Sequence, residues 1–269
     1  MNARFHAPAA ETIGAVIALP DDEAQHLTRV LRLKAGAAIR VFDGRGHEFD
    51  ALVESDGRNA RKSVGTSAVQ VRVVAAREPS AREPRVAVTL AQAVLKTENM
   101  DEAVRNAVMM GVAAIQPVVA TRSEVTLASL QRGSRVERWT RIAVSSAKQC
   151  GRATVPVILE PWPFDALPAA LSRLRLSDRL NAGPQMLPGP GLMFVEPSAS
   201  METIGLGDLD PAPPRDATIV TGPEGGWTLE EVEQASAACR LVTLGTLTVR
   251  ADVMPVVALA ALFTLWRDL

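Results

Sequence analysis

The sequence predicts an α/β protein, with a mainly parallel β-sheet covered by helices on both faces and a small β-rich domain before it. Two contrasting patterns lead to this prediction. Residues 1 to about 75 contain short apolar runs and one helix-like segment, whereas strand-like and helix-like segments alternate after residue 85. Between them, residues 77–85 (REPSAREPR) are charged and hold two prolines, which is typical of a linker. We therefore expect one domain at residues 1–76 and a second at residues 77–269.

Composition excludes several protein classes. The chain has 269 residues, 47% of them hydrophobic, and a net charge of -1. Overall charge therefore predicts no nucleic-acid partner, and such a site would need local clustering of basic residues. Cys150 and Cys239 lack metal-ligand spacing, so we expect neither a structural zinc nor a disulfide framework. No signal peptide is recognisable, and the longest apolar run, residues 254–266, is too short to cross a bilayer, so we expect a cytoplasmic protein.

In the N-terminal part, strands are expected at residues 15–19, 38–42, 48–53 and 69–75, and a helix at residues 22–33. Along that helix three basic residues recur three apart, so one face could present them together: His26, Arg29 and Arg32. On this pattern alone a solvated basic face is the favoured interpretation. The alternative is a phosphate-binding surface, which other basic residues could extend: Arg4, Lys34 and Arg45.

Farther along, strands are expected at residues 86–91 and 114–119, with a helix between them at residues 99–110, capped by Asn99. Residues 135–152 predict an amphipathic helix with an apolar side and a basic side. The basic side holds Arg135, Arg138, Arg141, Ser145, Lys148 and Arg152. Patterning leaves a solvated face and an RNA-binding face equally open. Residues 177–191 are rich in Pro and Gly and predict a loop, followed by a strand at residues 191–196.

The stretch at residues 217–233, ATIVTGPEGGWTLEEVE, is the most informative. A β-branched run predicts a buried strand, five residues (GPEGG) predict a tight turn, and Thr228 with Glu231 predicts a capping box that opens a helix. Ligand sites of open α/β sheets lie at such strand ends. The chain lacks both GxxxxGK[ST] and GxGxxG, and Glu224 would repel a pyrophosphate, so a neutral ring or a cation fits better. A purely structural turn is the alternative.

These residues resemble the RsmE family. The resemblance rests on TGPEGGW, on Leu244-Gly245 followed by Arg250 and an apolar C-terminal helix, and on three further segments: QHLTRVLRLKAG (residues 25–36), VFDGRG (41–46) and RWTRIAVSSAKQCGRATVP (138–156). The family consists of SPOUT-class methyltransferases that methylate N3 of a uridine in 16S rRNA. Membership implies an N-terminal PUA-like RNA-binding barrel, a deep trefoil knot in the C-terminal domain, and a homodimer formed through the knot region.

The resemblance also implies the site. The methyl donor would be S-adenosylmethionine, held by Thr221, Gly222, Pro223, Glu224, Gly225, Gly226, Leu244, Gly245, Leu247, Thr248 and Val249. Arg250 would stabilise charge on the uridine, and Asp252 would orient Arg250 or accept a proton. Small-subunit rRNA, within the assembled subunit, would be the partner. It would be contacted by Arg4, His26, Arg29, Arg32, Arg122, Lys148 and Arg152. No metal is implied.

Three residues after Gly245 depart from the family pattern. Leu247 stands where the family usually has Arg, and Ala251-Asp252 stands where it has Thr-Glu. These departures keep two alternatives open. One is a non-catalytic RNA-binding or ribosome-assembly protein with the same fold. The other is a SPOUT methyltransferase that acts on a different RNA.

Overall fold

The computed structural model describes residues 3–56, 69–172, 190–197 and 201–268. The chain divides into two compact units, Met1–Glu83 with Val144–Val155, and Pro84–Ala143 with Pro156–Leu269. Residues 144–155, which include the end of a long helix, therefore pack with the N-terminal part of the chain. Most of the loop expected at residues 177–191 lies outside the described residues.

The first unit is built on a five-stranded sheet with the strand order β1-β3-β4-β5-β2. Its strands are β1 (Arg4–His6), β2 (Val16–Ala18), β3 (Ala38–Phe42), β4 (Glu48–Asp56) and β5 (Val69–Arg77). All pairings are antiparallel except β1 with β3. Alternate residues of the long strands β4 and β5 are buried, as expected of a sheet with one face in the core. Phe5, Leu27 and Ile39 lie at the centre of this core.

The helix expected at residues 22–33 is shorter and irregular, which corrects the prediction. An α-helix, α1 (Asp21–Gln25), continues into a π-helical turn, η1 (His26–Val30). The chain then leaves the helix, because Arg32 adopts a left-handed conformation with φ 54°. That conformation commonly ends helices, although glycine usually occupies the position. Arg32 therefore does not share a helix face with His26 and Arg29.

The second unit is built on a parallel sheet of eight strands, ordered β11-β13-β10-β12-β6-β7-β8, with β9 beside β7. The strands are β6 (Ala87–Ala93), β7 (Ala114–Val119), β8 (Val157–Ile158), β9 (Trp162–Pro163), β10 (Gly191–Phe194), β11 (Ile204–Gly205), β12 (Asp216–Thr221) and β13 (Arg240–Thr243). The helices are α2 (Thr97–Met109), α3 (Leu127–Arg132), α4 (Arg135–Cys150), α5 (Ala166–Ser172), α6 (Leu229–Ser236), α7 (Met254–Leu265) and the 3-10 turn η3 (Leu206–Asp208).

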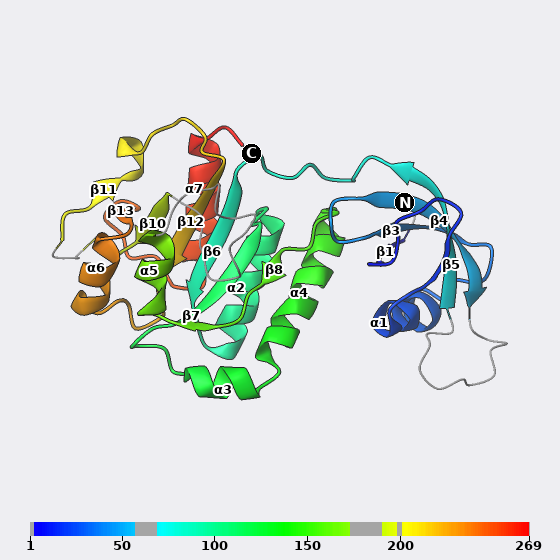
Figure 1. Cartoon of the computed structure of the whole chain (residues 1–269), viewed down its shortest axis with the longest axis horizontal. Coiled ribbons are helices and arrows are strands. Elements are labelled where there is room, and N and C mark those ends of the chain that lie inside the picture. The colour runs from blue at the N-terminus through cyan, green and yellow to red at the C-terminus, as the bar shows by residue number, and fades with distance from the viewer. Residues whose placement is uncertain (1–2, 57–68, 173–189, 198–200, 269) are drawn as a thin grey trace. The chain divides into compact units, whose positions relative to one another are not determined.

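Helices cover both faces of the sheet. Its central strand, β12, is buried along its whole length. Val220 and Met193 pack against α5 and α6. Leu90 and Ile219 are also fully buried. Along the strands they alternate with the residues that face α5 and α6, so their side chains point to the other face of the sheet. There α7 contacts both β12 and α2 (Figure 1). The predicted mainly parallel sheet with helices is confirmed.

Two helix starts show what the sequence could and could not predict. The capping box of α6 is confirmed, with Thr228 and Glu231 exchanging hydrogen bonds. Asn99, in contrast, does not cap α2, because the helix begins two residues earlier, at Thr97. No side chain of the helix itself caps α2, and a carboxylate from a distant loop contacts this end instead, as described below.

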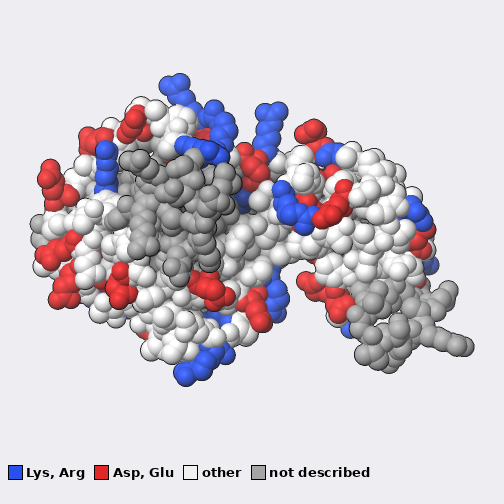
Figure 2. Space-filling view, in the orientation of Figure 1, with Lys and Arg blue, Asp and Glu red and all other residues white. Residues whose placement is uncertain are grey.

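Charge is mixed on the face shown in Figure 2, where Lys and Arg lie among Asp and Glu rather than in one continuous basic area. Within the described part of the chain, no helix combines the length and apolar character needed to span a membrane.

Candidate active site

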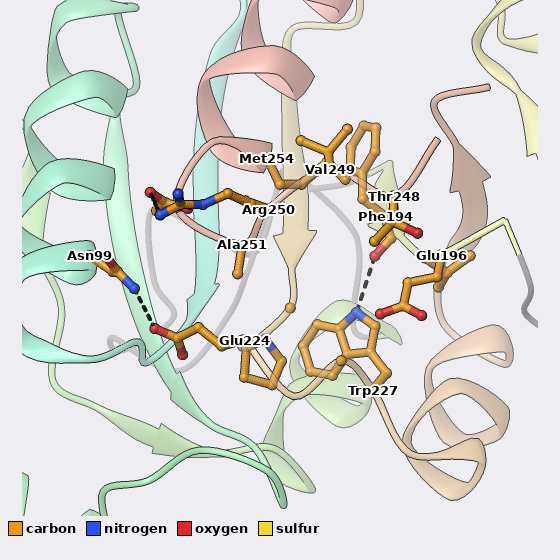
Figure 3. Close-up of a pocket in the computed structure, with 15 residues that line it drawn as sticks. Asn99, Phe194, Glu196, Glu224, Trp227, Thr248, Val249, Arg250, Ala251 and Met254 are labelled. Carbon is orange, nitrogen blue, oxygen red and sulfur yellow. Dashed lines mark hydrogen bonds and ion pairs between the residues drawn. The ribbon is translucent and has the colours of Figure 1, made fainter. Parts of the chain in front are cut away.

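A cavity of about 300 Å³ opens in the second unit, beside the ends of β10 and β12 and before α7. Figure 3 shows walls from the turn after β12, from the residues that end β10, from the loop that precedes α7, and from Asn99 of α2. It is lined by Asn99, Phe194, Val195, Glu196, Gly222, Pro223, Glu224, Gly226, Trp227, Thr248, Val249, Arg250, Ala251, Asp252 and Met254.

The glycines of the turn after β12 are needed for close packing. A Cβ atom on Gly222 would lie 3.1 Å from Nε1 of Trp227. Gly226 has φ +67°, and a Cβ there would lie 2.6 Å from Oε1 of Glu196. Glycine is the residue that tolerates such a backbone and such close neighbours. The turn therefore presents bare backbone to the cavity, as a ligand-binding turn requires.

Glu224, at the centre of this turn, is tied to the start of α2. Its Oε1 accepts hydrogen bonds from the backbone N–H of Lys96 (3.0 Å) and from Nδ2 of Asn99 (2.9 Å). The Lys96 ammonium pairs with Glu124 instead, and this hydrogen bond raises the pKa of Lys96. Glu224 thus joins the turn to the helix and adds negative charge to the cavity wall.

A buried polar contact supports the turn from below. Thr221, the last residue of β12, donates its hydroxyl to Oε1 of Gln92 at 2.7 Å, and both side chains are fully buried. Nε2 of Gln92 donates to the carbonyl of Gly222 at 3.4 Å. On the other side, Nε1 of Trp227 donates to the carbonyl of Phe194 at 3.1 Å. The turn is therefore fixed to both strands that flank β12.

Arg250 and Asp252 face each other at the cavity through two hydrogen bonds. Nε and Nη2 of Arg250 lie 3.0 and 2.9 Å from the two carboxylate oxygens of Asp252. Such a paired contact fixes the plane of the guanidinium. The Arg250 side chain is nevertheless 75% exposed, so its other edge can reach a ligand.

The cavity gathers only some of the residues predicted to hold a cofactor. Gly222, Pro223, Glu224, Gly226, Thr248 and Val249 line it, and both predicted catalytic residues do as well. The remaining ones do not line it: Thr221, Gly225, Leu244, Gly245 and Leu247. Leu247 points to solvent, with 79% of its surface exposed.

Sequence reasoning missed several lining residues: Asn99, Phe194, Val195, Glu196, Trp227 and Met254. Phe194, Val195 and Glu196 could have been found, because they end a predicted strand and the ends of parallel strands meet at one edge of a sheet. Asn99 could not have been found, because its contact with Glu224 joins residues 125 positions apart.

Two of the arginines predicted to contact RNA, Arg4 and Arg152, make internal contacts within the first unit. Arg4 donates to the carbonyls of Ala147 (3.1 Å) and Arg152 (2.7 Å) and pairs with the buried Glu48. Arg152 is only 4% exposed and places Nε and Nη2 at 2.9 and 2.6 Å from Glu83. Neither guanidinium can reach a phosphate without leaving its carboxylate.

The other predicted RNA contacts of this unit differ in exposure. Lys148 pairs with the buried Glu23 at 2.6 Å, so much of its charge is compensated. His26 is half-buried, with its ring edge-on to Phe5. Arg29 and Arg32 are exposed. The basic side predicted for the helix at residues 135–152 is therefore interrupted by carboxylates at Lys148 and Arg152, and also at Arg138, which pairs with Asp101.

Residues 82–263 match the RNA methyltransferase domain family, and residues 19–60 match the RNA methyltransferase PUA domain. The chain belongs to this RNA methyltransferase family. A relative from Synechocystis sp., ribosomal RNA small subunit methyltransferase E, is 28% identical over 93% of this chain and 73% of its own length. The protein of the same name from Bacillus subtilis is 27% identical over 90% and 87%. The resemblance to the RsmE family predicted from the sequence is confirmed.

Solved structures agree with this membership. A ribosomal RNA small subunit methyltransferase E from Neisseria gonorrhoeae, bound to S-adenosyl methionine, superposes with a TM-score of 0.77. It is 29% identical, and 99% of this chain and 98% of that chain are covered. A methyltransferase from Legionella pneumophila with bound SAM gives a TM-score of 0.79 at 26% identity, with 98% of each chain covered. Within the described residues, no group of three or more His, Cys, Asp or Glu side chains could hold a metal ion.

Proposed function

We propose that this protein transfers a methyl group from S-adenosylmethionine to N3 of a uridine in the 16S rRNA of the small ribosomal subunit. The observation that carries the proposal is the cavity at the ends of β10 and β12. There a glycine turn with accessible backbone lies opposite an arginine held in place by a carboxylate. Relatives named for this activity, and similar structures solved with the cofactor, support it.

The residues of the cavity suit this cofactor. Its volume of about 300 Å³ lies at the small end of ligand pockets. Three carboxylates line it, and Arg250 pairs with one of them, Asp252. The other two, Glu196 and Glu224, leave net negative charge, which favours a ligand with positive charge. When bound, S-adenosylmethionine supplies a methyl group on a cationic sulfur. The glycine turn would hold the cofactor through backbone groups, and Thr248 and Val249 would form the facing wall.

In the proposed reaction the chain acts mainly by positioning. Placing N3 in line with the bond from sulfur to methyl replaces a bimolecular encounter. As N3 gives up its proton to solvent water, negative charge spreads to O2 and O4 of the uracil, and the free edge of Arg250 can donate to one of these oxygens. Because both oxygens of Asp252 accept from Arg250, the geometry supports orientation of Arg250 as the role of Asp252.

The geometry also weighs against the non-catalytic alternative. Leu247, one of the three departures from the family pattern, points away from the cavity, so it leaves the lining unchanged. Asp252, the second departure, reaches Arg250 although it is shorter than Glu. Ala251, the third departure, lines the cavity. These departures therefore leave the pairing of Arg250 with Asp252 in place.

We further propose the features that distinguish the SPOUT class. These are a trefoil knot near the C-terminus and a homodimer through this region. From the charged linker we also propose a division at residues 76 and 77 into an RNA-binding and a catalytic domain. Helix α7 supports the dimer, because Val253 at its start and Val257 within it remain 40% and 36% exposed. Light scattering tests this: a mass of one chain would contradict the dimer.

The test of the function is methyl transfer from labelled S-adenosylmethionine to small ribosomal subunits that lack their own uridine-N3 methylation. Nucleoside analysis should then show 3-methyluridine. Cofactor binding without transfer would favour the non-catalytic alternative. Transfer to tRNA but not to the subunits would favour a different RNA substrate.

A further inference from the structure

Arg122 contacts the glycine turn directly, although it does not line the cavity. Its Nη1 donates to the carbonyl of Gly225 at 2.8 Å and to the carbonyl of Trp227 at 3.2 Å. Hydrogen bonds from a charged donor are stronger than neutral ones, and two of them converge here on one turn. The sequence singled out Arg122 only as a candidate for contact with RNA.

The loop that carries Arg122 is itself fixed. The backbone N–H of Thr121 donates to Oε1 of Glu231 at 2.7 Å, and Glu231 is buried within the capping box of α6. The neighbouring residue on the other side, Ser123, closes a turn onto the carbonyl of Ala120. The guanidinium therefore projects from an anchored backbone, which lets it impose a position on the turn.

Gly225 gives an independent indication of the same contact. Unlike Gly226, it has no positive φ angle that would require glycine. A Cβ atom at Gly225 would instead lie 3.0 Å from Cβ and 3.3 Å from Cδ of Arg122. The absence of a side chain at this position thus lets the arginine pack against the turn.

We propose that Arg122 is a positioning residue for the cofactor site, holding the turn at residues 222–226 in the geometry that forms the cavity wall. This inference rests on the proposed function, because the ligand it concerns is S-adenosylmethionine. Arg122 acts through the turn and touches neither the cofactor nor the uridine. Without its guanidinium, the carbonyls of Gly225 and Trp227 lose their donor and the turn relaxes before ligand binds.

The first test replaces Arg122 by Met, which keeps the aliphatic stem and removes every donor, and by Lys, which keeps one charged donor. Binding of S-adenosylhomocysteine, measured by calorimetry, should weaken about tenfold or more for Arg122→Met, since bonds from charged donors are lost. Arg122→Lys should recover part of this loss. The matched control is Arg105→Met, because Arg105 is a half-buried arginine of the same unit that pairs with Glu102 and lies outside the cavity lining.

Kinetics separate this role from contact with RNA. For Arg122→Met, KM for S-adenosylmethionine should rise much more than KM for RNA. Wild-type affinity for S-adenosylhomocysteine together with a raised KM for RNA would overturn the proposal and make Arg122 an RNA contact. If the wild-type protein itself does not bind S-adenosylhomocysteine, the proposed function fails and this inference fails with it. If the wild type binds and Arg122→Met binds equally well, only the inference about Arg122 fails.

A double-mutant cycle tests the same contact independently, and its Gly225→Ala arm leaves Arg122 itself unchanged. Gly225→Ala pushes the turn away from Arg122, because the added Cβ would lie 3.0 Å from Cβ of Arg122. Arg122→Ala keeps that Cβ and removes the guanidinium that donates to the turn. If the two residues act through one contact, the double variant should bind S-adenosylhomocysteine little more weakly than the worse single variant. Fully additive losses would overturn the proposal.

Discussion

At the scale of single residues, the cavity depends on contacts between side chains that are remote in sequence. The turn at residues 222–226 and its capping box could be predicted, because glycine tolerance and helix capping are local properties. The neighbours that require those glycines could not be predicted. Trp227 lies close in sequence to Gly222, but Glu196 reaches Gly226 only because β10 and β12 are adjacent in the sheet.

The pair formed by Arg250 and Asp252 leads to the first residue-scale prediction. Arg250→Ala should abolish methyl transfer while S-adenosylhomocysteine affinity stays within a few-fold of wild type, because Arg250 acts on the uridine. Asp252→Asn keeps one acceptor but loses the charge that orients the guanidinium, so it should lower kcat less than Arg250→Ala does. Single-turnover transfer and calorimetry measure the two effects. Undiminished transfer by Arg250→Ala would remove the arginine from the mechanism.

Cys239 gives a second residue-scale prediction, which concerns reactivity. Burial raises the pKa of the Cys239 thiol to about 12, and the thiol contacts the carbonyl of Ala235 at 3.1 Å. The thiolate is the nucleophile, so at pH 8 only a minute fraction of Cys239 can react with iodoacetamide. Mass spectrometry should find Cys239 unmodified in native protein and modified after unfolding. Rapid labelling of native protein would contradict the raised pKa of this half-buried thiol.

At the scale of elements, α6 and its capping box show the limit of local prediction. The sequence predicted that Thr228 and Glu231 would exchange hydrogen bonds, and they do. It gave no sign that Glu231 also accepts from the backbone of Thr121, which follows β7. One carboxylate therefore caps a helix and joins it to the loop that carries Arg122.

This double contact predicts unequal effects of capping substitutions. Glu231→Ala leaves two part-buried backbone donors, the N–H groups of Thr121 and Thr228, without their acceptor, which should cost about 2–3 kcal/mol of unfolding free energy. Thr228→Ala removes one cap bond and should cost about 1 kcal/mol. Glu230→Ala is the control, because Glu230 is the exposed neighbour of Glu231. Denaturant unfolding measures all three, and equal losses for Glu231→Ala and Thr228→Ala would mean that the contact with Thr121 adds nothing.

At the scale of the whole molecule, the hydrophobic pattern and the basic pattern of the sequence differ in what they could predict. Alternating strands and helices predicted the parallel sheet, because hydrophobic periodicity reports which face of each element is buried. Basic periodicity along residues 135–152 predicted a basic face but not its partners. Residues 144–155 pack with the first unit, where Glu23 and Glu83 pair with Lys148 and Arg152. A periodic pattern shows the side on which charges lie, but carboxylates from elsewhere in the chain decide whether they are free.

The basic residues of the first unit should therefore fall into two groups. Arg4→Met should destabilise the protein by about 2–4 kcal/mol, because it removes a charged partner of the buried Glu48. It also removes the donor to the carbonyls of Ala147 and Arg152, so hydrogen exchange should speed up at residues 144–155. Arg29→Ala, at an exposed position, should leave stability within about 0.5 kcal/mol of wild type.

The same two variants should affect RNA binding in the opposite order from stability: Arg29→Ala should change it and Arg4→Met should not. If Arg29 contacts a phosphate, Arg29→Ala should weaken binding and lower the slope of log K against log salt by about one. Arg4→Met should leave that slope unchanged under conditions where it remains folded, because Arg4 is already held by Glu48 and by backbone carbonyls. Fluorescence anisotropy over a range of salt concentrations measures both slopes. A reduced slope for Arg4→Met would show that RNA displaces the internal ion pair, and would return Arg4 to the binding surface.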